Sequence, residues 1–223
     1  MYELFEKWKG CQKCSLCTPY RKNVVFGCGN DINPKILVIG EAPGPQENEQ
    51  GIPFIGPTGQ LLRRNLHKAG IRPDEDCYIT NAVLCYPTDD GQKFRAPKGS
   101  EILTCRERLG EQFSLLAERG SLRAILLVGK RAHVTWFQRA GLERGDYATD
   151  KPFDEMKVKD VMGWYSGSLP WPDIKVMTIY HPSYIARTKL QESSREFQEW
   201  LQDMKALGDR ALKDKLWDPR PVK

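Results

Sequence analysis

A loop that carries two carboxylates and an aromatic ring directly follows a short apolar segment. Residues 35–40 read KILVIG, and Glu41, Glu47 and Phe54 come next in a stretch rich in glycine and proline. Open α/β folds bind ligands in loops at the carboxyl ends of buried strands. No Gly-Lys-Ser or Gly-Lys-Thr follows this acidic loop, which argues against a nucleotide-phosphate enzyme. We therefore expect residues 40–56 to hold a ligand site that is not a phosphate cradle.

The cysteines suggest a metal site. Cys11 and Cys14 form a C-x-x-C pair, and Cys85 and Cys105 are single cysteines far downstream. Four thiolates suit either structural zinc or an iron–sulfur cluster. Zinc ribbons usually carry two C-x-x-C pairs, so the two isolated cysteines favour a cluster. The sequence begins without a secretion-signal pattern, so we expect thiols or metal ligands, not disulfides.

Three further cysteines leave alternatives open. Cys17 extends the pair to C-x-x-C-x-x-C, but Arg21 stands where the bacterial ferredoxin pattern places its fourth cysteine. Cys17 could still replace Cys11 or Cys14 as a ligand. We expect Cys28 and Cys77 to be incidental, and all seven cysteines could be ordinary buried thiols.

Alternating apolar runs and helical patterns must position these residues. Strands are predicted at 35–40, 77–84, 123–129 and 174–180, and helices at 58–69, 100–118, 130–140 and 193–212. Gly70 and Gly141 follow predicted helix ends, and Ser100 is a plausible helix cap. Repeated strand–helix units indicate a three-layer α/β/α fold around a mainly parallel, four-stranded sheet.

The totals indicate one soluble unit. The 223 residues are enough for a single domain, 1–223, with a C-terminal helix and tail at about 190–223 and a long excursion at 143–172. No apolar stretch approaches the ~20 residues that span a bilayer. We expect a cytoplasmic monomer without membrane contact. A net charge of +5 permits contact with a polyanion but does not require it.

Taken together, the motifs resemble the family 4 uracil-DNA glycosylases, which carry a [4Fe-4S] cluster. The matching segments are residues 11–16, 23–27, 29–30, 40–44, 53–56, 59–62, 78–85, 124–129 and 181–184, with Arg187. The resemblance implies a base-excision repair enzyme that hydrolyses the N-glycosidic bond of uracil in single- or double-stranded DNA and leaves an abasic site. It implies a uracil-DNA glycosylase-like fold and DNA as the partner.

The resemblance also implies roles for individual residues. The cluster ligands would be Cys11, Cys14, Cys85 and Cys105. Glu41, Glu47 and His181 would be catalytic, and Ala42, Phe54 and Asn81 would bind the substrate. For the segment after His181, we expect Tyr184 and Ile185 to act as a wedge in the DNA and Arg187 to contact a phosphate, although Tyr184 and Ile185 could instead pack against the last helix.

These roles have a physical basis. The glycosidic bond breaks through an oxocarbenium-like state, which a carboxylate stabilises, and the departing uracil is an anion, which a histidine donor stabilises. His67 and His133 fall inside helical patterns, whereas His181 lies in a loop beyond a strand. Asn81 could otherwise be a turn residue, and Phe54 could be a core aromatic.

Two segments depart from the family pattern. The loop 86–98 is longer than usual and only partly similar, and its basic part, 93–98, lacks a histidine, so we expect no covalent attachment to the abasic site. The excursion at 143–172 is also unusual. The alternative function is therefore a diverged protein of this fold that binds or modifies DNA bases without excising uracil.

Overall fold

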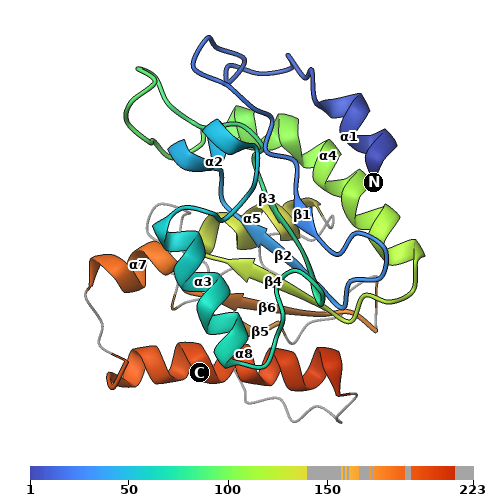
Figure 1. Ribbon diagram of the computed structural model, residues 1–223, viewed down its shortest axis with the longest axis vertical. Coiled ribbons are helices and arrows are strands. Elements are labelled where there is room, and N and C mark those ends of the chain that lie inside the picture. Colours follow the sequence, from blue (N-terminus) through green and yellow to red (C-terminus); the bar gives the residue numbers. More distant parts are fainter. Residues whose placement is uncertain are drawn as a thin grey trace.

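The computed structural model describes residues 1–139, 157, 159, 161–165, 171, 173–188 and 192–213. Most of the predicted excursion, together with Ala140, Gly141 and the tail at 214–223, lies outside these residues. In the described part, one sheet has the strand order β1-β3-β2-β4-β6-β5 (Figure 1). Its strands are β1 (Cys28–Gly29), β2 (Ile36–Gly40), β3 (Cys77–Asn81), β4 (Ala124–Val128), β5 (Gly163–Trp164) and β6 (Lys175–Ile179).

The four long strands are the four that we predicted, and they run parallel to one another. The predicted total of four is too low, because β1 and β5 add short antiparallel edges. These two-residue strands show no period of their own in the sequence. The chain passes from β2 to β3 on one side and then to β4 on the other, so the strand order reverses at β2. Such a reversal opens a crevice beyond the carboxyl ends of the strands.

Side chains alternate between two hydrophobic layers. Ile36 and Val38 of β2 face a cluster that includes α3 (Pro57–Lys68) and α8 (Arg195–Leu212). Leu37 and Ile39 face the opposite cluster, which includes α4 (Gly99–Glu118) and α5 (Lys130–Arg139). All five residues of β2 are buried, as expected for a central strand covered on both faces. The three-layer prediction is confirmed.

A third hydrophobic cluster covers the N-terminal segment. It joins α1 (Tyr2–Trp8), the cysteine-bearing residues after it, and the first half of α4. Figure 1 shows this segment and α1 at the top of the molecule, next to α4. Two short helices, α2 (Pro45–Gln50) and α7 (Pro182–Arg187), complete the described elements, and the sequence analysis missed both of them, as it missed α1.

Several predicted boundaries are wrong. Helix α4 is capped by Lys98, not by Ser100, because the Glu101 carboxylate accepts the Lys98 N–H at 2.7 Å. The strand predicted at 77–84 ends at Asn81, and the helix predicted from 193 begins at Arg195, where the Ser194 hydroxyl caps it. Gly70 follows α3 with φ +80, as predicted for a residue past a helix end. Across the described ranges, no helix is long and apolar enough to cross a membrane.

Candidate functional site

The carboxyl ends of the four parallel strands open into one cleft of about 590 Å³. Glu41 follows β2, Asn81 ends β3, Gly129 follows β4 and His181 comes shortly after β6. The other lining residues come from three places: residues 42–47, 54 and 56–58, Phe94 with Lys130 and Arg131, and Ser183, Tyr184 and Arg187 of α7. The predicted catalytic and substrate-binding residues therefore all line a single cavity.

Glu47 holds the loop 41–56 in shape. Its carboxylate accepts the N–H groups of Ile55 at 3.0 Å and Gly56 at 2.8 Å through Oε1, and that of Gly44 at 3.1 Å through Oε2. The side chain is 7% exposed. With three backbone donors on a buried carboxylate, Glu47 closes the loop on itself. This arrangement suits a positioning residue better than one that reacts.

Glu41 is the more accessible carboxylate of the loop. Its Oε1 lies 3.1 Å from Arg131 Nε, and its side chain is 25% exposed. Burial raises the pKa of Glu41, while the positive charges of Arg131, Lys130 and Arg187 act in the opposite direction. Arg131 also donates to the backbone oxygen of Pro97 at 3.3 Å, which connects α5 to the loop 86–98. A carboxylate is thus fixed at the cleft beside a cationic partner.

Phe54 is held in an unusual backbone conformation. It is the one non-glycine residue in the described part of the chain with positive φ, at 56°. Two glycines make room for it: a Cβ on Gly59 would lie 2.2 Å from the Phe54 carbonyl carbon, and a Cβ on Gly40 would lie 2.4 Å from the Phe54 ring. Non-glycine residues with positive φ cluster at ligand sites, where the surroundings hold them in place. The ring is thereby pressed against the end of β2.

Asn81 presents its amide at the same place. A Cβ on Gly40 would lie 2.3 Å from Asn81 Oδ1, so the amide also depends on glycine at this position. Asn81 is 2% exposed, and its side chain makes no hydrogen bond with any described residue. Its backbone oxygen accepts from Arg108 at 2.7 Å. The amide oxygen and N–H₂ therefore remain available to a ligand that offers both a donor and an acceptor.

His181 is fixed in one tautomer. Its Nδ1 accepts the backbone N–H of Ser183 at 3.2 Å and lies 2.8 Å from the Ser183 hydroxyl. The hydroxyl in turn accepts from Arg187 at 3.3 Å. Because Nδ1 is an acceptor, the neutral ring carries its proton on Nε2. Burial, with a smaller effect of Arg187, lowers the pKa of His181 to about 4, so the ring is neutral at pH 7.

The four predicted cysteine ligands belong to the third hydrophobic cluster. Cys85 and Cys105 are buried in it, and Cys11 and Cys14 pack against it. Burial raises the pKa of the Cys85 thiol to about 12, and the nearby Cys105 and Cys14 sulfurs add to this effect. Burial likewise raises the pKa of Cys14, with smaller effects of Cys105 and Cys11. The four sulfurs thus lie close enough to interact electrostatically.

The four thiols have the chemistry, though not the single-ion spacing, of an anionic metal–thiolate group. Within the described ranges, no three His, Cys, Asp or Glu side chains are close enough to hold one metal ion. Arg108, three residues after Cys105 on α4, is fully buried, and its Nε–H has no acceptor. A buried guanidinium without a carboxylate partner needs a nearby negative charge. Metal-bound thiolates at Cys105 and Cys85 would supply it.

Comparison with known proteins agrees with this geometry. The profile of the Uracil DNA glycosylase superfamily matches residues 26–205. The chain belongs to this superfamily. It is 32% identical over 188 residues to a Type-4 uracil-DNA glycosylase of Pyrobaculum aerophilum, covering 84% of this chain and 85% of that protein.

Two further relatives show a similar extent of likeness. The Type-4 uracil-DNA glycosylase of Thermotoga maritima is 30% identical, with 87% of this chain and 89% of that protein covered. The Archaeoglobus fulgidus protein of the same name is 32% identical, with 89% and 87% covered. The resemblance read from the motifs is therefore confirmed.

The predicted contact between Ile185 and DNA needs correction. Ile185 is 3% exposed and belongs to the core cluster beneath α7, so its side chain is not placed to enter DNA. Tyr184 and Arg187 do line the cleft. The sequence analysis missed the contributions of Arg131, Ser183 and Arg108. Of these three residues, only Ser183 could have been found from the sequence, because it stands two residues after His181, within reach of the imidazole ring.

Proposed function

We propose that this protein hydrolyses the N-glycosidic bond between uracil and deoxyribose in DNA and leaves an abasic site. The supporting observation is the convergence of Glu41, Phe54, Asn81 and His181 on one cleft at the carboxyl ends of four strands. The names of the relatives support the same substrate. DNA is the partner that this function requires. We retain a monomer in the cytoplasm as a prediction.

The proposed reaction starts with extrusion of the base. Turning uracil out of a duplex costs a few kcal/mol of unstacking, and less from a single strand. Phe54 then stacks on the base, and Ala42 lines the same wall of the cleft. The Asn81 amide hydrogen-bonds the adjacent carbonyl and imide groups of uracil. These contacts favour uracil over a base with a different polar edge.

Bond cleavage separates charge, and the cleft holds a group for each sign. As the bond from the sugar carbon to the uracil nitrogen breaks, positive charge develops on the deoxyribose, where the Glu41 carboxylate stabilises it and orients the attacking water. Negative charge spreads onto the uracil oxygens, and His181 donates to one of them from Nε2. A neutral donor suffices, which agrees with its lowered pKa. Water supplies the oxygen that joins the sugar and the proton that uracil takes.

Cys11, Cys14, Cys85 and Cys105 would hold a [4Fe-4S] cluster. One C-x-x-C pair with two isolated cysteines favours a cluster over a zinc ribbon, and all four residues meet at the third hydrophobic cluster. Hydrolysis transfers no electron, so the cluster would fasten the N-terminal segment to α4. Structural zinc is the alternative.

The direct test uses oligonucleotides that carry a single uracil, both as single strands and in duplexes. Release of free uracil, with a product that breaks in alkali, supports the proposal. Glu41→Gln and His181→Ala should each slow the single-turnover rate about 10²-fold or more. Parent-like rates in both variants would contradict the assigned roles, and binding without base release would favour the non-excising alternative.

A further inference from the structure

Phe94 is an exposed aromatic residue on the lining of the cleft. It belongs to the loop 86–98, and its side chain is 49% exposed. The ring of Tyr86 is its neighbour, but the two centroids are 6.3 Å apart and the rings are tilted by 35°, so most of the Phe94 ring remains uncovered. A single exposed aromatic residue is ordinary on a protein surface, so the place of Phe94 in the lining of the cleft, and not its exposure alone, points to a role in binding.

The loop holds Phe94 in a defined position. Asp90 Oδ1 accepts the N–H groups of Gln92 at 2.9 Å and Lys93 at 2.8 Å, which makes a tight turn just before the phenylalanine. On its other side, Arg95 donates its backbone N–H to Pro87 at 2.9 Å. Because the backbone on both sides of Phe94 is already ordered, less conformational entropy is lost when the ring binds a ligand.

Arg95 also anchors the loop to the body of the protein. Its guanidinium makes two hydrogen bonds to the buried carboxylate of Glu101, at 2.7 and 2.9 Å. Arg95 and the Ser15 hydroxyl lower the pKa of Glu101 to about 2, against the effect of burial, so the carboxylate stays charged. Charged pairs with this forked geometry are the strong ones. The loop is therefore a fixed platform on the N-terminal end of α4.

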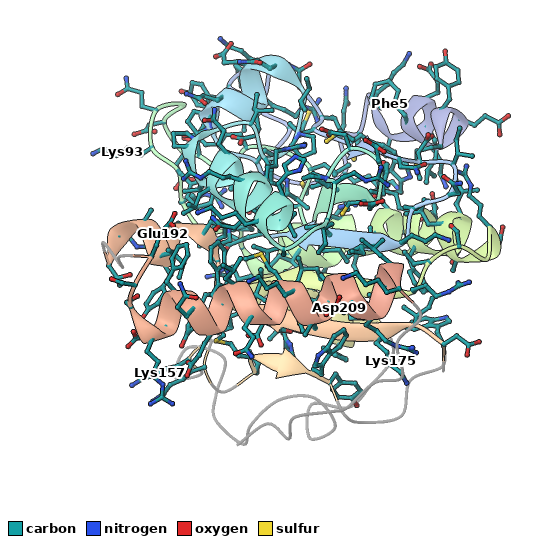
Figure 2. All side chains as sticks on the ribbon, turned by 60° about the horizontal axis from the view of Figure 1, so that its bottom comes forward. Phe5, Lys93, Lys157, Lys175, Glu192 and Asp209 are labelled. Carbon is teal, nitrogen blue, oxygen red and sulfur yellow. The ribbon has the colours of Figure 1, made fainter. Side chains whose placement is uncertain are left out.

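The charges around Phe94 suit a nucleic-acid strand. Lys93 is exposed beside it, and Figure 2 shows the Lys93 side chain reaching outward from the edge of the molecule. Lys130 and Arg187 line the cleft that Phe94 shares. Exposed aromatic rings next to cationic side chains are how proteins hold single-stranded DNA, because every base has a face on which a ring can stack.

The cleft has room for more than the extruded base. Its volume of about 590 Å³ lies in the range of sites for drug-sized ligands, which are larger than one pyrimidine. Phe54, at 7% exposure, is enclosed in this cleft. Tyr184 is 37% exposed but stacks on Tyr180 with ring centroids 4.7 Å apart, so Phe94, at 49%, is the most open of the three aromatic rings that line the cleft. We propose that Phe94 stacks on an unpaired base next to the extruded uracil, so that the loop 86–98 forms a second base site for single-stranded DNA. This inference rests on the proposed function.

The test compares the parent protein with Phe94→Ala and Phe94→Trp. Each is titrated, in a Glu41→Gln background that slows cleavage, with a fluorescent single strand carrying one uracil, and binding is followed by anisotropy. Phe94→Ala should bind about tenfold more weakly, and Phe94→Trp should bind like the parent. Tyr2→Ala is the matched control, because Tyr2 is an exposed aromatic, 74% accessible, that does not line the cleft.

A second strand, whose nucleotides on both sides of the uracil lack bases, isolates the stacking contact. On this strand the affinity of the parent should fall to that of Phe94→Ala, and the affinity of Phe94→Ala should change little. In a fully paired duplex the neighbouring bases stay stacked, so the Phe94→Ala effect should fall below threefold.

Two results would overturn the inference. One is unchanged single-strand binding in Phe94→Ala. The other is an equal loss with and without the neighbouring bases, which would mean that the ring contacts something other than a base. Because the readout is binding, it stays informative if the parent releases no uracil. That outcome contradicts the proposed function, not the base contact.

Discussion

Arg108 donates a hydrogen bond to the backbone oxygen of Asn81 at 2.7 Å, from a fully buried position on the helix that carries Cys105. The same terminal nitrogen, Nη2, donates to Ala82 at 3.0 Å, and the other, Nη1, donates to Gln112. One guanidinium therefore joins the cysteine-bearing face of α4 to the end of β3. The Asn81 amide, which we propose reads the base, and the proposed cluster are parts of one packed unit.

Arg108→Lys tests this connection. Lysine keeps the charge, but its single ammonium cannot reach the acceptors that the fork spans, and at least one buried carbonyl loses its donor. We expect the melting temperature to fall by about 5 °C. We also expect kcat/KM on uracil DNA to fall about tenfold or more at a temperature well below melting, because Asn81 is displaced.

Arg119→Lys is the control for this substitution, because Arg119 is exposed at the C-terminal end of the same helix. It should leave both quantities unchanged. A loss of stability in Arg108→Lys with parent-like kcat/KM would show that Arg108 supports the fold without positioning Asn81.

Metal analysis of cysteine variants tests the cluster. The parent should contain about four iron atoms and four acid-labile sulfides per chain, and Cys85→Ala and Cys105→Ala should lose both. Cys17→Ala and Cys28→Ala should retain the iron and the sulfide, because neither residue belongs to the third hydrophobic cluster. Zinc without iron in the parent would establish the structural alternative. Iron loss in Cys17→Ala would make Cys17 a ligand.

The sequence predicted the central fold because the local and global signals agree there. Residues 36–40 are apolar throughout, which is typical of a strand that is covered on both faces. The structure places β2 within one residue of the prediction. The rule that ligands lie at strand carboxyl ends then located the loop that carries Glu41. Asn81 and His181 were assigned to the same site through the family resemblance.

Contacts made across long stretches of sequence could not be predicted. Helix α2 is short and is held by Asn48, whose side chain bonds the backbone of Tyr20 and Lys22. Glu47 holds its loop by accepting hydrogen bonds from the backbone N–H groups of Ile55 and Gly56. The sequence does not show that the chain folds back to bring these groups to Glu47. A buried arginine without a carboxylate partner is equally invisible in the sequence, since arginine is normally exposed.

Gly59→Ala should disturb the site without touching the substrate. The added Cβ would lie 2.2 Å from the Phe54 carbonyl carbon, so the backbone must move, and with it the ring. We expect kcat/KM to fall at least tenfold. Gly99→Ala is the matched control, because a Cβ there has no neighbour within 4 Å. Equal kinetics in the two variants would show that Phe54 does not depend on this close approach.

The pKa of His181 predicts how stability changes with pH. An unfolded histidine has a pKa of about 6.5, whereas burial lowers the pKa of His181 to about 4. As the pH falls from 6.5 to 4, the unfolded state binds a proton that the folded state does not, so this residue costs stability, up to about 3 kcal/mol. Denaturant unfolding should therefore show a smaller acid loss in His181→Asn than in the parent. His67→Asn, altered at an exposed helical position, should behave like the parent.

The rate should depend on pH through Glu41 and not through His181. Burial raises the pKa of Glu41 above its usual 4.5, and catalysis needs the carboxylate, so the rate should fall with decreasing pH from a point above 4.5. His181 stays neutral down to about pH 4 and should produce no step near 6.5. Single-turnover rates from pH 4.5 to 8 are the measurement. Glu41→Gln should be slow and flat, and His181→Asn should be slow but keep the acid limb. A step near pH 6.5 that disappears in His181→Asn would show that the imidazole titrates normally, and the neutral-donor assignment would then be wrong.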